Sequence, residues 1–301
     1  MTPRSALAHK GLVVEEWIDL HFFRPLGMRL VRRLAPTGVT ADQVTAAALL
    51  VGLAAGHLFL YRSVLLNALG LLLFVVSDIL DSADGQLARF RGASTRLGRI
   101  LDGVADNLRF INLYAHLVAR LLLAHAMGPA AVLLLAVAAG YSQSLQASIA
   151  DFLRLVYLFV AERRGEVDLP EDLVRSNPVS RTARAAQAVY AAYVAQQARW
   201  CPGSVAAVRA LRRGSAPPGL AEEWRERQAA SVARCALISQ NVRFLLLALT
   251  AMIGRPAGFF WLTLGPLNLA LAWVLLAHER TAARLARAPA AAPGLMVAES
   301  L

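Results

Sequence analysis

The sequence Asp81-Ser82-Ala83-Asp84-Gly85-Gln86-Leu87-Ala88-Arg89 is followed by Gly98, Asp102 and Asp106, and long apolar runs flank the whole stretch. A carboxylate inside a bilayer costs about 2.5–3.5 kcal/mol at a helix centre on insertion scales, so membrane-embedded acids usually mark a functional site. Four such acids so close together require a shared positive partner. A divalent metal ion is the simplest partner of that kind.

The spacing of the acids places them on two helix faces, because residues three and four positions apart share one face of an α-helix. One stripe carries Asp81 and Asp84, and the other carries Asp102 and Asp106. Facing each other, the stripes would form an oxygen cage suited to Mg²⁺, Mn²⁺ or Ca²⁺ rather than zinc. Arg89 would supply a phosphate partner one turn further on. Small residues on the same stripes would let a ligand approach the backbone closely; they are Gly85, Ala88 and Gly98.

Written as a pattern, the stretch reads D-x2-D-G-x2-A-R-x8-G-x3-D-x3-D. It resembles the signature of the CDP-alcohol phosphotransferase family at every defined position, and the apolar segments on both sides also fit that family. The resemblance implies an integral-membrane enzyme that moves a substituted phosphate from a CDP-linked donor to an alcohol and releases CMP.

The resemblance also implies a role for each signature residue. Asp81, Asp84 and Asp102 would be ligands of Mg²⁺ or Mn²⁺, with two ions in the site. Asp106 would be the general base for the acceptor alcohol and a further metal ligand. Arg89 would lie near the phosphates of the donor. The cytidine nucleotide would pack against the small residues, which are Gly85, Ala88 and Gly98.

Three charged residues outside the signature are further candidates. Asp78 precedes the signature by one helical turn; it would either orient Arg89 or a metal ligand, or lie as a polar residue at the membrane interface. Arg109 lies one turn beyond Asp106 and would either bind an acceptor or donor phosphate or neutralise carboxylate charge. Arg243 would contact the acceptor headgroup or a phosphate, or extend its guanidinium to the interface.

Composition independently indicates a membrane protein. The 301 residues are 57% hydrophobic yet include 31 Lys and Arg, a combination that requires apolar and basic residues to be segregated. A spanning helix needs about 20 apolar residues. Six segments qualify: residues 41–61, 64–81, 100–124, 129–160, 233–253 and 257–277. We therefore expect an all-α polytopic membrane protein with six transmembrane helices, an N-terminal amphipathic helix and a cytoplasmic helical insertion.

These spans divide the chain into five parts. In order, they are an N-terminal cytoplasmic amphipathic arm (1–40), spans one to four with the aspartate motif (41–160), a cytoplasmic helical insertion (161–232), spans five and six (233–278) and a flexible cytoplasmic tail (279–301). Thr40 is predicted to cap the first span, and Pro266 to kink the last one. Within the insertion, helices are predicted near 180–200 and 219–232.

The arginines set the orientation, because positively charged loops stay in the cytoplasm. They gather in the N-terminal arm, between spans two and three, in the insertion and in the tail. Both termini and the aspartate site should therefore face the cytoplasm, in an inner membrane of bacterial type. The net charge of +11 then indicates a basic face toward anionic lipid and nucleotide. It does not indicate nucleic-acid binding, because the basic residues follow the ends of the membrane segments.

The hypothesis is an enzyme of phospholipid biosynthesis that transfers phosphatidyl from CDP-diacylglycerol to an alcohol. The resemblance also suggests a homodimer. Glycerol phosphate, inositol phosphate, serine or another alcohol stay open as acceptors, as does transfer of a CDP-linked small alcohol to a lipid. One alternative is a membrane prenyltransferase that binds a diphosphate through Mg²⁺ and aspartates, although it needs no Gly85, Ala88-Arg89 or Gly98. The other is a non-catalytic scaffold that recruits partners through residues 161–232.

Overall fold

The computed structural model describes residues 13–92, 96–173 and 181–287, and within these ranges every regular element is a helix. The side chains of residues 96–102, 181–183, 185, 186 and 287 lie outside that description. In chain order the elements are η1 (Asp19–Phe23), α2 (Arg24–Leu34), α3 (Ala41–Leu58), α4 (Val64–Phe90), α5 (Arg96–Leu123), α6 (Pro129–Ala161), α7 (Pro170–Leu173), α8 (Arg181–Trp200), α9 (Pro202–Arg212), α10 (Leu220–Ala233), η2 (Arg234–Ile238), α11 (Gln240–Met252), α12 (Ala257–Leu264) and α13 (Pro266–Arg287).

Membrane-spanning stretches follow from length and apolar composition. In the described part of the chain five qualify: Ala41–Leu58, Val64–Phe90, Pro129–Ala161, Leu220–Met252 and Ala257–Ala286. The expected all-α polytopic membrane protein is thereby confirmed. The segment predicted as a span at 100–124 is helix α5, which is not among the five. Its polar and charged side chains, including Arg109 and Arg120, lower its mean hydropathy.

Local signals set several helix ends. Thr40 caps α3 as predicted, because its hydroxyl accepts from Gln43 N–H and the Gln43 side chain accepts from Thr40 N–H. The predicted break at Pro266 is also present, since α12 ends at Leu264 and α13 begins at Pro266. The helix then continues to Arg287 and buries Ala282, so it covers the first residues of the segment expected to be a flexible tail.

The chain divides into two compact units, and the five parts expected from the sequence stay a prediction. Unit 1 comprises Met1–Ser144 and Ser239–Asn268, and unit 2 comprises Leu145–Ile238 and Leu269–Leu301. The boundaries therefore pass through α6 and α13. All described residues of the aspartate motif belong to unit 1.

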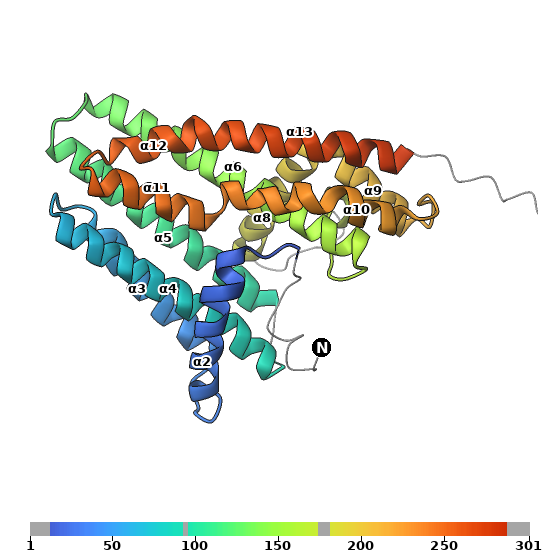
Figure 1. Cartoon of the computed structure of the whole chain (residues 1–301), viewed down its shortest axis with the longest axis horizontal. Helices are drawn as coiled ribbons and strands as arrows, with labels where there is room; N and C mark the ends of the chain where they lie inside the picture. The colour runs from blue at the N-terminus through green and yellow to red at the C-terminus, as the bar shows by residue number, and fades with distance from the viewer. Residues whose placement is uncertain (1–12, 93–95, 174–180, 288–301) are drawn as a thin grey trace, which may run out of the picture. The chain divides into compact units, whose positions relative to one another are not determined.

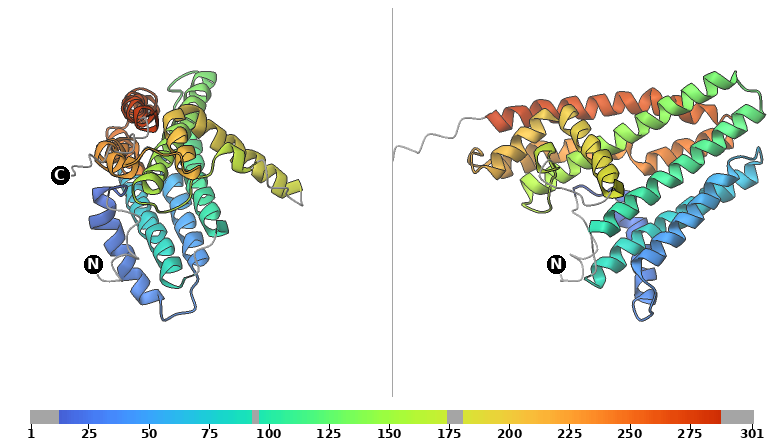
Figure 2. Two further views of the ribbon diagram at one scale, coloured as in Figure 1. Left: turned by 90° about the vertical axis from the view of Figure 1, so that its right-hand side faces the viewer. Right: turned by 180° about the vertical axis from the view of Figure 1, so that it is seen from behind.

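Unit 1 is built around three neighbouring helices. Helix α3 packs against both α4 and α5, as the right-hand view of Figure 2 shows for these blue to teal segments. Glycines permit the close approach: a Cβ on Gly52 would lie 2.4 Å from Cδ of Arg109, and one on Gly56 would lie 2.2 Å from Oδ1 of Asn112. Helix α2 packs on α4 (Figure 1), where Val31 and Leu87 are buried in one cluster.

A larger apolar cluster ties the remaining helices of unit 1 to this core. Phe74 of α4 and Phe244 of α11 are stacked with ring centroids 4.9 Å apart. Leu113, Leu247 and Phe259 are fully buried in the same cluster. Helix α11 is thus held against α4 although it lies far from α4 in the sequence.

Unit 2 contains the predicted helices near 180–200 and 219–232, observed as α8 and α10, and an additional helix α9 that we did not predict. Glu279 of α13 caps α9, because its carboxylate accepts from the backbone N–H of Gly203 and Ser204 and from the Ser204 hydroxyl. The bond from Ser204 N–H measures 3.2 Å. Toward the other end of α9, Arg209 binds Glu171, and this guanidinium lowers the pKa of Glu171 to about 2.

Candidate active site

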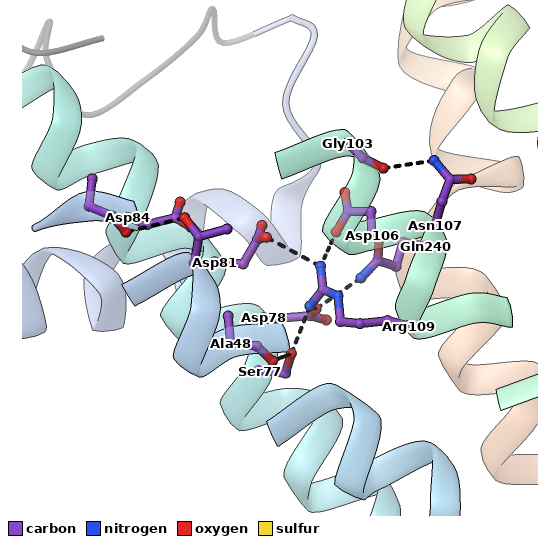
Figure 3. A network of polar contacts seen from close by, with 12 residues as sticks. Ala48, Ser77, Asp78, Asp81, Asp84, Gly103, Asp106, Asn107, Arg109 and Gln240 are labelled. Carbon is purple, nitrogen blue, oxygen red and sulfur yellow. Dashed lines mark hydrogen bonds and ion pairs between the residues drawn. The ribbon is translucent and has the colours of Figure 1, made fainter. Parts of the chain in front are cut away.

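Helices α4 and α5 bring one acid from each predicted stripe together, and Arg109 is the group at which these two acids meet (Figure 3). Nη2 of Arg109 donates to Oδ1 of Asp81 at 3.2 Å and also to Oδ1 of Asp106. Two carboxylates bound to one nitrogen must lie close together. The helical spacing therefore predicted correctly that α4 and α5 present acids to each other.

Arg109 is buried, with 4% of its surface exposed, and its second terminal nitrogen is also engaged. Nη1 donates to Ser77 Oγ at 2.7 Å and to Asp78 Oδ1 at 3.2 Å. The Ser77 hydroxyl in turn donates to the Ala48 carbonyl at 2.8 Å, which links the network to α3. Arg109 thus pairs with three carboxylates, and its contact with an acceptor or donor phosphate stays a prediction.

Asp78 has a second partner on a distant helix. Nε2 of Gln240, the first residue of α11, donates to Asp78 Oδ1 at 2.9 Å. Ser239 positions this residue by capping α11 through the N–H of Val242. Asp78 therefore orients an arginine, but its described partners are Arg109 and Gln240, whereas we had considered Arg89.

Asp84 lies apart from the Arg109 network. It is 5% exposed and accepts a hydrogen bond from the Thr45 hydroxyl of α3. By contrast, the side chains of Asp81 and Asp106 are 31% and 38% exposed. Of the three acids that Arg109 contacts, Asp81 and Asp106 are therefore the ones that a bound substrate reaches more easily than Asp78.

The remaining signature residues are distributed along the same two helices. A Cβ on Gly85 would lie 3.4 Å from Nη1 of Arg89, so the glycine and the guanidinium share one face of α4. Ala88 is half-buried on α4. Gly98 and Asp102 belong to α5, in the part of that helix whose side-chain surroundings the structure does not describe.

Two partners of the acids, Gln240 and Thr45, were not predicted. Gln240 lies in a polar run, Ser239-Gln240-Asn241-Val242-Arg243, and this run was a usable signal. Within it, only Arg243 was singled out as a candidate site residue. Arg243 is 3% exposed within α11. Its contact with the acceptor stays a prediction.

The carboxylates offer oxygen ligands of the kind that Mg²⁺ and Mn²⁺ prefer. Among residues 13–92, 103–173 and the later described segment, no group of three His, Cys, Asp or Glu lies close enough to hold a metal ion. Asp102 was predicted to complete the cage and lies outside that search. Asp81 and Asp106, which converge on one nitrogen, fit a shared cation between α4 and α5.

A sequence model of the family described as CDP-alcohol phosphatidyltransferase matches residues 38–210, which is more than half of the chain. The match includes the whole aspartate signature and ends within α9, before α11. No curated protein matches the chain.

Proposed function

Because the chain belongs to the CDP-alcohol phosphatidyltransferase family, we propose that it transfers phosphatidyl from CDP-diacylglycerol to an alcohol and releases CMP. Family membership and five apolar helices identify a membrane transferase of phospholipid synthesis. The observation that carries the finer proposal is the convergence of Asp81 and Asp106 across α4 and α5. It brings acids of both signature halves to one place.

Asp106 is proposed as the general base. Its Oδ1 accepts from Arg109, so Oδ2 is the atom assigned to accept the proton of the acceptor hydroxyl. The hydroxyl oxygen then forms a bond to the phosphorus distal to the cytidine. The bond from that phosphorus to the bridging oxygen breaks, and the leaving group is CMP. Arg109 fixes the carboxylate of Asp106 relative to Asp81 throughout.

Binding of the donor is assigned to the rest of the signature. Two Mg²⁺ or Mn²⁺ ions, when held by the four aspartates, would neutralise the charge that develops on the diphosphate; these ligands are Asp81, Asp84, Asp102 and Asp106. Arg89 is positioned on the same helix face as Gly85, where its fork suits a phosphate. Contact with the nucleotide is assigned to Gly85, Ala88 and Gly98.

The surroundings of the site support a lipid donor and a cytoplasmic location. Val64–Phe90 is itself a membrane-spanning stretch, and it carries the acids near its C-terminal end. A lipid anchored in the bilayer can therefore present its headgroup to that end of α4. The arginine distribution supports the assignment of this end and both termini to the cytoplasm. A homodimer remains part of the proposal.

The test is turnover of labelled CDP-diacylglycerol by the purified chain with a panel of acceptor alcohols, with products identified by mass. We expect CMP release that chelator abolishes and Mg²⁺ or Mn²⁺ restores. Asp106→Asn should lower the single-turnover rate about 10²–10⁴-fold with donor binding largely kept, whereas Asp81→Asn should also weaken donor binding and raise the metal requirement. Asp151→Asn, at a carboxylate that is 62% exposed outside the motif, is the matched control.

Three outcomes would contradict the proposal. Pyrophosphate release would favour a prenyltransferase. Absence of metal-dependent turnover with any CDP-linked donor would favour a scaffold. Transfer from a CDP-linked small alcohol to a lipid acceptor, tested in a parallel reaction, would reverse the assignment of donor and acceptor.

A further inference from the structure

Two histidines from different helices of unit 1 meet away from the aspartates. His57 lies in the last turn of α3 and His116 lies in α5. Nδ1 of His57 is 2.9 Å from Nε2 of His116, and the ring planes are inclined by 88°. His116 follows Asp106 by ten residues on the same helix, which corresponds to about 15 Å along the axis. The pair is therefore separate from the proposed catalytic site.

The hydrogen bonds of the outer ring nitrogens define the state of both rings. Nδ1 of His116 is 2.8 Å from the Asn112 carbonyl, which can only accept, so Nδ1 carries the proton and Nε2 has a lone pair. Nε2 of His57 is 3.4 Å from the Tyr61 hydroxyl. A consistent neutral network runs from the Tyr61 hydroxyl to His57 Nε2, and from His57 Nδ1–H to His116 Nε2.

This arrangement contains the features of a two-histidine metal ligand set. Metal-binding histidines commonly use their second nitrogen to bond a carbonyl or another oxygen, which fixes the tautomer and the ring orientation. With metal–nitrogen bonds of about 2.0–2.1 Å, two nitrogens 2.9 Å apart subtend about 90° at a metal ion placed beside the line that joins them. That is the angle between neighbouring ligands in the tetragonal geometry of Cu²⁺ and Ni²⁺. Binding requires the two rings to tilt, so that each lone pair turns from the other nitrogen toward the metal.

We propose that His57 and His116 form a binding site for a divalent transition-metal ion with tetragonal preference, Cu²⁺ or Ni²⁺. Binding requires no net loss of a proton. His57 changes tautomer, so that Nδ1 binds the metal and Nε2–H donates to the Tyr61 oxygen, which changes from donor to acceptor. His116 keeps its proton on Nδ1 and binds through Nε2.

The surroundings suit two protein ligands with the other coordination positions open. In the part of the chain that the structure describes, no third His, Cys, Asp or Glu joins the pair. His57 is exposed in the last turn of the membrane-spanning stretch Ala41–Leu58, and His116 is half-buried, so other protein groups do not enclose the pair. Arg120 is one turn beyond His116, and its Nη1 donates to the Phe59 carbonyl at 3.3 Å and to Asn67 Oδ1 at 3.4 Å.

The test is Cu²⁺ titration of the tag-free full chain in detergent, followed by electron paramagnetic resonance, with Mg²⁺ in excess to occupy the aspartates. We expect one Cu²⁺ per chain with couplings from two nitrogens. His57→Gln and His116→Gln should each weaken this binding at least tenfold. Tyr61→Phe should weaken it by a smaller factor, because it removes only an orienting bond. His21→Gln, at a ring that bonds the Trp17 carbonyl, is the control and should leave binding unchanged.

Absence of Cu²⁺ uptake by the wild-type chain would overturn the proposal. A wild-type spectrum with no coordinated nitrogen or with one would do the same, and this measurement does not depend on any variant folding. Unchanged affinity in both glutamine variants would also refute it. Because the aspartates offer only oxygen ligands and the readout is coupling to nitrogen, these outcomes are independent of whether the chain transfers phosphatidyl.

Discussion

Replacing Arg109 with methionine removes the guanidinium that contacts Asp78, Asp81 and Asp106. The side chains of Arg109 and Asp78 are only 5% and 10% exposed, so water cannot take the place of the lost cation. Removing one partner of a buried ion pair costs about 3–5 kcal/mol, because the other charge stays buried. Coulomb's law agrees: unit charges 3.2 Å apart interact by about 5 kcal/mol at an effective dielectric constant near 20.

We therefore expect Arg109→Met to lower the unfolding temperature by about 6–20 °C, from 2–4 °C per kcal/mol in domains of comparable size. The measurement is thermal unfolding of the chelator-treated protein in detergent. Arg227→Met, at an exposed residue paired with Glu223, is the control, since such pairs contribute at most about 1 kcal/mol. Mg²⁺ should stabilise Arg109→Met more than it stabilises the wild type, because the ion replaces part of the missing charge.

A double-mutant cycle tests the assigned cause. Asp78→Asn removes the most deeply buried of the three carboxylate charges, so Arg109→Met should cost less in that background. If Arg109→Met is no more destabilising than Arg227→Met, Arg109 does not compensate buried negative charge. Additive effects of the changes at Arg109 and Asp78 would exclude the ion pair as the cause.

The remaining predictions concern unit 2. Glu279→Ala leaves the first N–H groups of α9 without their acceptor. It should lower the free energy of unfolding by about 1–3 kcal/mol, measured by thermal unfolding. Glu223→Ala is the control and should have little effect; an equal loss of stability in both variants would exclude the proposed cap. Arg209 lowers the pKa of Glu171 from 4.5 to about 2, so the stabilisation from this pair is complete above about pH 4.5 and is lost as the pH falls toward 2. The difference in unfolding temperature between wild type and Glu171→Gln should shrink over that range, and a difference independent of pH would refute the assignment.

Much of the helical structure could be predicted because its signals are local. The Thr40 cap needs only a partner three residues away, and the break at Pro266 needs only the proline. Helix α9 was harder to predict, because the carboxylate that caps it comes from Glu279, far along the chain. Helix α5 coincides with the span predicted at 100–124, and packing inside unit 1 buries its Arg109 and Arg120, which the sequence alone did not indicate.

In the candidate site, too, the contacts that depend on local spacing could be predicted, and those between distant helices could not. Helical spacing correctly placed Asp81 opposite Asp106, because a repeat of three to four residues fixes which side chains share a face. It did not identify Gln240, whose partner is 162 residues away. Such a contact depends on how two distant helices pack, and no local pattern encodes that packing.

The discontinuity of unit 1 has a consequence for biosynthesis. Asp78 leaves the ribosome 162 residues before Gln240, which corresponds to about 8–32 s at roughly 5–20 residues per second. During this interval the nascent protein carries a buried acid without the amide of α11. A translation product that stopped at residue 210 would contain the entire family-matched segment and the full signature, yet no part of α11. Quality control that senses exposed polar groups in the bilayer would therefore encounter an incomplete site on every chain that stalls before its last spans.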